Sequence, residues 1–83
     1  MADMDKKEME AAVESILFAS GEPVNIERIC VALAIDRPTA ERILQGLMDY
    51  YAYERRGMRL LKIEDCWQLC SAPDYAEAIR RAF

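Results

Sequence analysis

The chain has 83 residues, of which 53% are hydrophobic and 31% are charged, a balance typical of one small globular domain and not of a disordered segment. Eleven Lys and Arg against fifteen Asp and Glu give a net charge of −4, which weighs against strong binding to a nucleic-acid backbone, because such binding needs clustered basic residues. The sequence contains no run of about 18 apolar residues and no signal-peptide core, so we expect a cytoplasmic protein.

The sequence also lacks the residues that most enzymes and metal sites use. Histidine is absent, and Cys30, Cys66 and Cys70 form no Cys-x-x-Cys pair, which argues against a zinc site or a disulfide framework. The cysteines are expected to be small buried hydrophobic residues. The acidic positions of residues 3–14 are interpreted as a solvated helix face. We therefore expect no enzymatic activity, no cofactor and no metal.

The first expected helix covers about residues 5–20. Asp5 and Glu8 have the spacing of an N-terminal capping box. Its apolar residues recur at the spacing of a one-sided helix: Met9, Ala12, Val13, Ile16 and Leu17. Gly21 can end the helix in a left-handed conformation, and Pro23 cannot continue it. The residues that follow are predicted to form a short extended link.

Two further helices are expected over about residues 26–34 and up to about Tyr53. Asn25 and Asp36 are their predicted N-caps, and Pro38 suits the first turn of the later helix. The side chains expected to face inward are Ile26, Ile29, Cys30, Leu33, Ala40, Ile43, Leu44, Leu47, Met48 and Tyr51. Gly46 lies in mid-helix at a cost of about 1 kcal/mol relative to alanine, and a close helix–helix approach would explain it.

A β-hairpin is predicted next, because the apolar pattern changes to a period of two. The alternating residues are Leu61, Ile63, Trp67 and Leu69. Pairing Ile63 with Trp67 would place all four on one apolar face and leave a three-residue loop at residues 64–66. Such a loop commonly ends with a left-handed residue, so Cys66 is predicted to have a positive φ, unless the loop uses another geometry.

A last short helix is expected over about residues 74–82, with Tyr75, Ile79 and Phe83 on its apolar side. The order helix, helix, helix, strand, strand, helix predicts an α+β winged helix. Its parts would be a three-helix helix-turn-helix core, a two-stranded hairpin wing and a short C-terminal helix. Residues 1–83 are expected to form this single domain, with about residues 1–7 flexible. The abrupt stop at Phe83 suggests a piece cut from a longer chain.

A DNA-binding winged-helix regulator is the main alternative function. Such a protein presents its third helix to the major groove. The polar face of that helix here carries Arg37, Glu41, Arg42, Gln45, Asp49 and Glu54. Its three carboxylates would repel phosphates, and the basic spot at Arg55 and Arg56 is small. Charge therefore weighs against direct DNA binding without excluding it.

The candidate protein-interface residues are Tyr50, Tyr53, Leu60 and Cys70. Tyr50, Tyr51 and Tyr53 cannot all point inward on a 3.6-residue period. Leu60 and Cys70 fall on the hairpin face opposite the predicted apolar one. These residues are either ordinary exposed apolar surface or an interface for a like subunit or another protein.

Residues 11–24, AAVESILFASGEPV, resemble the start of segregation and condensation protein B. The similarity continues at Ile26, Leu33, Leu44 and Leu47, then at GMRL (57–60), WQL (67–69) and PDY (73–75). The family usually has a glycine where this chain has Cys66. The family also has two winged-helix domains in tandem, and this chain would hold only the first.

The resemblance implies a non-catalytic subunit of the bacterial SMC–kleisin complex for chromosome condensation and segregation. It implies that this domain forms homodimers and helps to scaffold the kleisin subunit, segregation and condensation protein A. The second domain would make much of the kleisin contact, and the SMC partner would hydrolyse ATP. No small-molecule substrate, no membrane and no strong direct DNA binding are expected. The implied location is the cytoplasm, at the nucleoid through the complex.

Overall fold

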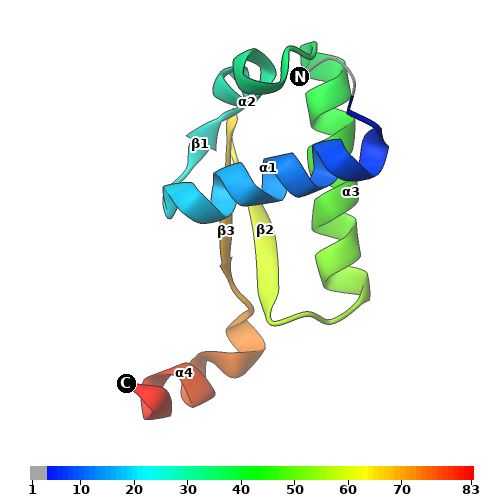
Figure 1. Cartoon of the computed structure of the whole chain (residues 1–83). Helices are drawn as coiled ribbons and strands as arrows, with labels where there is room; N and C mark the ends of the chain where they lie inside the picture. Colours follow the sequence, from blue (N-terminus) through cyan, green and yellow to red (C-terminus); the bar gives the residue numbers. More distant parts are fainter. Residues whose placement is uncertain (1–3) are drawn as a thin grey trace.

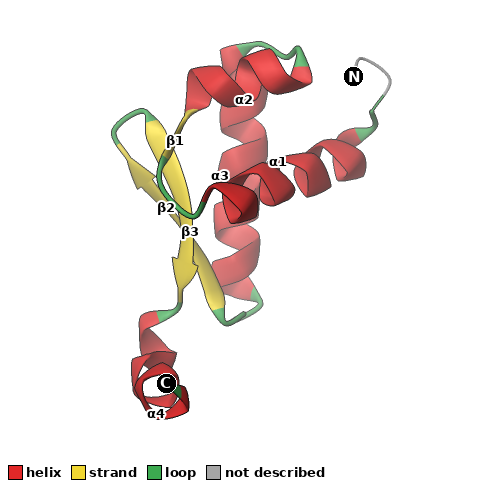
Figure 2. Cartoon of the chain, turned by 60° about the vertical axis from the view of Figure 1, so that its left-hand side comes forward, coloured by secondary structure: helices red, strands yellow, loops and turns green. Residues whose placement is uncertain are grey.

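The computed structural model describes residues 4–83. The elements, in chain order, are α1 (Lys6–Ser20), β1 (Val24–Asn25), α2 (Ile26–Leu33), α3 (Arg37–Tyr53), β2 (Met58–Ile63), β3 (Cys66–Ser71), a 3₁₀ turn (Pro73–Tyr75) and α4 (Ala76–Ala82) (Figure 1). Helices α1 and α3 lie against the sheet, α2 lies at its end beside β1, and α4 projects from the end of β3 (Figure 2). This is the α+β winged helix that the sequence predicts.

Helix α1 is closed at both ends by the residues expected from the sequence. The Asp5 carboxylate accepts a hydrogen bond from the Glu8 N–H at 2.8 Å, and the Glu8 carboxylate accepts one from the Asp5 N–H at 3.2 Å. Gly21 ends the helix in the left-handed conformation with φ 68°. Lys6 and Lys7, part of the segment expected to be flexible, lie inside this helix, while residues 1–3 lie outside the described residues.

Helices α2 and α3 begin at the predicted N-caps. The Asn25 side chain accepts a hydrogen bond from the Glu27 N–H at 2.8 Å. The Asp36 side chain accepts one from the Thr39 N–H at 2.9 Å, and hydrogen bonds from Thr39 lower the pKa of the Asp36 carboxyl. Ala34 ends α2 at a φ of 55°, so a left-handed residue reverses the chain before α3 without a glycine.

The sheet has three strands, not the two of the expected wing. The segment predicted as a link forms β1, in which Val24 pairs with Trp67 and Asn25 with Cys66, so β3 is central in the order β1-β3-β2. Val24 is buried on the same side of the sheet as Trp67. The link between α1 and α2 is therefore part of the core.

The predicted hairpin register is wrong by one residue. Cys66 lies opposite Ile63, Trp67 opposite Lys62 and Leu69 opposite Leu60. The turn contains two residues, and its left-handed member is Glu64 with φ 57°, whereas Cys66 has no positive φ. The sequence allows both registers because both faces of β2 carry apolar residues, Leu60 on one and Leu61 and Ile63 on the other. The two-residue turn selects the register in which Leu60 faces the core.

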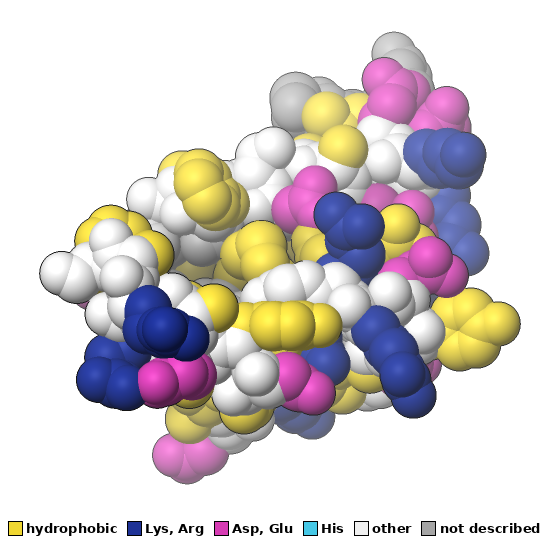
Figure 3. Space-filling view, turned by 90° about the horizontal axis from the view of Figure 1, so that it is seen from below, with side chains coloured by type: hydrophobic (Ala, Val, Ile, Leu, Met, Phe, Trp, Pro, Cys, Tyr) yellow, Lys and Arg dark blue, Asp and Glu magenta, His cyan; other side chains and the backbone are white. Residues whose placement is uncertain are grey.

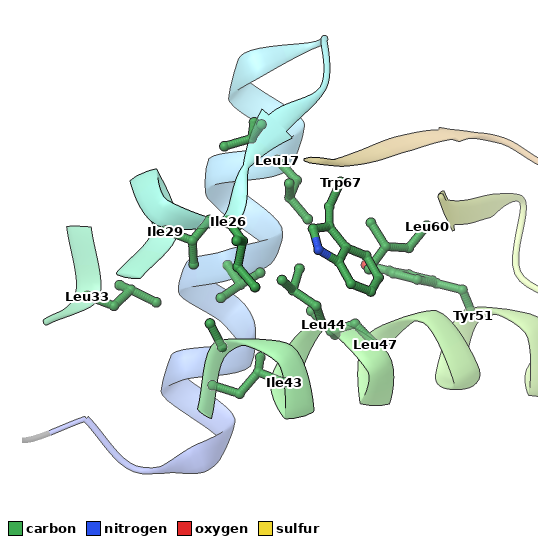
Figure 4. Close-up of a cluster of buried hydrophobic side chains, with 13 residues drawn as sticks. Leu17, Ile26, Ile29, Leu33, Ile43, Leu44, Leu47, Tyr51, Leu60 and Trp67 are labelled. Carbon is green, nitrogen blue, oxygen red and sulfur yellow. The ribbon is translucent and has the colours of Figure 1, made fainter. Parts of the chain in front are cut away.

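The core lies between the sheet and the helices α1, α2 and α3. In Figure 4 the Trp67 indole lies between Leu17 of α1 and Leu44 and Leu47 of α3. The side chains predicted to be inward on the first three helices are all buried in this cluster or packed against it. Gly46 is different, because a Cβ added there would meet no atom within 4 Å, so no close helix approach explains it.

Candidate functional site

The structure separates the four candidate interface residues. Tyr50 and Tyr53 lie one turn apart near the end of α3, with exposed fractions of 54% and 84%. Leu60 is only 2% exposed and belongs to the core, so its prediction as an interface residue is wrong. Cys70 is half-buried beside Arg59, with its Sγ 3.7 Å from the Arg59 carbonyl oxygen. Leu60 pairs with Leu69, and side chains of paired residues point to the same face of a sheet. Cys70 is the next residue after Leu69, so its side chain points to the opposite face from that of Leu60.

Tyr51 is the tyrosine of this group that points inward. It is buried, and its hydroxyl donates a hydrogen bond to the Glu14 carboxylate, which ties α3 to α1. The Tyr50 ring packs edge-on against the Tyr51 ring, with centroids 5.7 Å apart and an interplanar angle of 66°. Tyr50 is thus held in place by a buried neighbour while most of its own ring faces solvent, as suits a residue of a binding surface.

A groove between α1 and α3 begins at Tyr50. It has a volume of about 370 Å³ and is lined by Lys7, Glu10, Ala11, Glu14, Gly46, Leu47 and Tyr50. Gly46 and Ala11 contribute no large side chain to it. The mid-helix glycine therefore lines this groove and does not serve close packing between helices.

Other large apolar side chains are exposed outside α3. Phe18 on α1 is 74% exposed and Val31 on α2 is 82% exposed, so both lie off the buried faces of their helices. Leu61 and Ile63 were expected to face the core, but each is 45% exposed on the outer face of the sheet. A hairpin register that places Leu60 toward the core would have predicted this outer apolar face from the sequence.

The start of α3 and the tip of the hairpin meet in an acidic cluster around one arginine. The Arg37 guanidinium lies 2.6 Å from the Asp65 carboxylate and 3.4 Å from that of Glu27, and Glu41 is 4.0 Å away. The hydrogen bond to Asp65 and its charge raise the pKa of Arg37. Three carboxylates around one cation leave this corner negative, where a DNA-reading winged helix would need donors for phosphates.

Within residues 4–83, no group of three or more His, Cys, Asp or Glu side chains is placed to hold a metal ion. Burial, and next the charge of Glu27, raise the pKa of the Cys30 thiol, which lowers its reactivity as a nucleophile. Over the same residues, none of the helices is both long and apolar enough to cross a membrane.

The fold and its surfaces define a winged-helix domain. The corner formed by the start of α3 and the hairpin tip is acidic, and the exposed side chains of the domain include many apolar ones. The model of the segregation and condensation complex subunit ScpB matches residues 11–83. The chain therefore belongs to the ScpB family.

Relatives of this family cover nearly all of the chain. Segregation and condensation protein B of Lachnoclostridium phytofermentans is 38% identical over 76 residues, which are 92% of this chain and 40% of the relative. The protein of the same name from Ruminiclostridium cellulolyticum is 32% identical over 80 residues, which are 96% of this chain and 42% of the relative. The chain thus spans about two fifths of the length of these relatives.

Solved structures share the fold. ScpB from Mycobacterium tuberculosis superposes with a TM-score of 0.91 at 18% identity, covering 96% of this chain and 50% of that one. A crystallised dimer of a ScpB N-terminal domain in complex with a ScpA peptide gives a TM-score of 0.87 at 23% identity, covering 93% of this chain and 96% of that one. At these identities the likeness establishes the fold.

Proposed function

We propose that this domain is a non-catalytic assembly module of the bacterial SMC–kleisin complex for chromosome condensation and segregation. It forms a homodimer and scaffolds the kleisin subunit, segregation and condensation protein A, in the cytoplasm at the nucleoid. The observation that carries this proposal is the family match over residues 11–83. A related N-terminal domain that has been crystallised as a dimer with a ScpA peptide supports the choice of both partners.

The surface chemistry also supports a protein partner over DNA. Tyr50 provides an exposed aromatic ring at the groove between α1 and α3, and Tyr53 provides a second one a turn later on α3. Aromatic residues are enriched at protein interfaces. The corner made by α3 and the hairpin tip is instead acidic around Arg37. Arg55 and Arg56 form a small basic spot beyond α3, the feature that most favours the alternative, a DNA-binding regulator.

Titration of the domain with the central segment of the kleisin from the same organism tests the proposal. We expect saturable binding with one kleisin segment per domain or per dimer, measured by isothermal titration calorimetry. A scrambled segment of the same composition is the control. Equal heats from the two segments, or no binding to either at concentrations up to about 100 µM, a free-energy limit of about −5.5 kcal/mol, would reject a kleisin scaffold.

A further inference from the structure

Helix α4 carries an apolar side that its own domain leaves uncovered. No residue of 73–83 is buried, and Tyr75, Ile79 and Phe83 follow one another at intervals of four, which places them on one side of the helix. Figures 1 and 2 both show α4 projecting away from the other elements, and Figure 3 shows apolar side chains exposed among charged ones at this end of the molecule. A helix of seven residues is not stable in water by itself, so contact of the apolar side of α4 with a partner would stabilise the helix.

The start of α4 is fixed in a direction that leads away from the domain. Ala72 is fully buried, and its N–H donates a hydrogen bond to the Gly57 carbonyl oxygen at 2.8 Å. The Tyr75 N–H donates to the Ala72 carbonyl oxygen at 3.1 Å, and the Asp74 carboxylate lies 3.8 Å from the Arg59 guanidinium. Because these contacts hold the connection, the apolar side of α4 does not fold back onto its own domain.

An apolar surface that fits this helix lies between the end of α1 and the base of the hairpin. Two adjoining hollows of about 300 Å³ each share the side chains of Phe18, Met58 and Leu69. Met58 and Leu69 are half-buried at the edge of the core, and Phe18 is largely exposed beside them. We call this surface, made by Phe18, Met58 and Leu69, the α1–hairpin groove.

We propose that α4 of one copy packs into the α1–hairpin groove of a second copy, and that the second copy returns the same contact. This exchange is a closed two-fold arrangement, in which each copy offers both the helix and the groove and no unfilled site remains for a third copy. The proposal rests on the homodimer of the proposed function and names the surfaces that form it.

The available apolar area suits a second copy as the occupant. Aromatic side chains bury about 150–250 Å² each when they are fully covered. The two copies together supply six aromatic rings, from Phe18, Tyr75 and Phe83 of each copy. Because Tyr75 is only 47% exposed and Phe18 74%, the area that these rings can still bury is about 700–1,100 Å². A stable interface buries about 1,200–2,000 Å², and Ile79, Met58 and Leu69 of each copy supply the remainder. The exchange therefore reaches about the lower limit of that size with a second copy alone.

Sedimentation equilibrium of four versions of the chain tests the exchange. Ile79→Glu places a charge on the apolar side of α4, and Phe18→Glu places one in the groove. Arg81→Glu is the control, because position 81 lies on the opposite side of α4 from Ile79. We expect the unchanged chain and Arg81→Glu to dimerise alike, and Ile79→Glu and Phe18→Glu each to raise the dimer dissociation constant at least about tenfold. Circular dichroism checks that each version is folded, as expected for changes at exposed positions.

Mixing the two weakened versions adds a test of the reciprocal contact. A pair made of Ile79→Glu and Phe18→Glu keeps one intact helix–groove contact, so it is expected to associate more tightly than either version does alone. No gain on mixing would overturn the exchange.

The outcomes separate the exchange from dimerisation itself. If the unchanged chain dimerises and either Ile79→Glu or Phe18→Glu dimerises equally well, then α4 does not bind this groove, and the homodimer uses another surface. If the unchanged chain stays monomeric at high concentration, then the proposed homodimer is rejected and the exchange is rejected with it.

Discussion

Glu64 forms the hairpin turn with a φ of 57°, a conformation that glycine adopts more readily than glutamate. Replacement by glycine is expected to raise the free energy of unfolding by about 0.5–1 kcal/mol. The left-handed conformation costs a residue with a side chain about 1–2 kcal/mol, and glycine avoids this cost but loses more backbone entropy on folding. Urea unfolding monitored by Trp67 fluorescence measures the change.

The neighbouring turn residue provides a matched control for this prediction. Asp65 has no positive φ and bonds to Arg37, so Asp65→Gly is expected to lower the stability of the domain. If Glu64→Gly were also destabilising, the hairpin would not turn as described.

Tyr51 gives the domain a specific dependence on alkaline pH. Burial and the hydrogen bond to Glu14 raise the pKa of its hydroxyl above the value of about 10 for an exposed tyrosine. Because the native state then holds this proton more tightly than the unfolded chain, the stabilisation is fully present below pH about 10 and is lost as the pH rises through the native pKa. We expect the free energy of unfolding to fall above pH about 10 for this reason.

Two conservative substitutions isolate this effect. Tyr51→Phe should be less stable at neutral pH by about 1–3 kcal/mol and should show a smaller alkaline fall, whereas Tyr53→Phe, at an exposed position, should behave as the unchanged chain. Denaturant unfolding across the alkaline range measures both quantities. An identical alkaline fall in Tyr51→Phe and the unchanged chain would contradict a buried, hydrogen-bonded Tyr51.

At the scale of the elements, α3 contains a glycine that packing does not require. Gly46→Ala is expected to stabilise the domain by about 1 kcal/mol, because alanine favours the helix and the added Cβ meets nothing within 4 Å. Gly21→Ala should have the opposite sign, since Gly21 ends α1 at a φ of 68°. Thermal unfolding of the two variants measures both shifts. Destabilisation by Gly46→Ala would show that the groove over α3 is narrower than described.

The helices could be predicted from the sequence because their signals are local. Asp5, Asn25 and Asp36 each cap a helix that begins within one residue of them, and Gly21 ends α1 as predicted. These residues act on backbone groups at most four positions away, so the chain order alone contains the information.

The sheet was predicted less well because its pairing depends on residues that are distant in sequence. Val24 becomes part of a strand only through Trp67, more than forty residues later. In β2, Leu60 and Leu61 are equally apolar, and turn length together with contact with the helices decides that Leu60 faces inward. Because the observed register differs by one residue from the predicted one, Leu60 faces the core, and Leu61 and Ile63 are exposed on the outer face.

The candidate surface was predicted in part. Exposure of Tyr50 and Tyr53 follows from helical periodicity, since Tyr51 takes the inward position between them. The surface offered by α4 could not be recognised, because its apolar residues have the spacing of an ordinary core-facing helix. Only the three-dimensional arrangement shows that α4 leads away from the core.

At the scale of the whole molecule, two ends of the domain differ in character. One end joins α2, the start of α3 and the hairpin tip in the acidic cluster around Arg37. The other end carries α4, and the domain extends over 43 × 22 × 20 Å. An acidic winged-helix corner and a projecting helix with one apolar side suit a subunit that assembles with proteins better than one that reads base pairs.

Binding of the isolated domain to duplex DNA tests this central claim most directly. The affinity for a labelled duplex is measured by fluorescence anisotropy at about 50 mM and about 200 mM salt. Binding to phosphates is recognised by an affinity that falls with salt, and the fall is steeper when more phosphates are neutralised. We predict no micromolar binding at the lower salt concentration, since the carboxylates of Glu27, Glu41 and Asp65 surround Arg37 where phosphates would lie. Micromolar or tighter binding at low salt that weakens steeply at the higher concentration would contradict the account and favour a DNA-binding regulator.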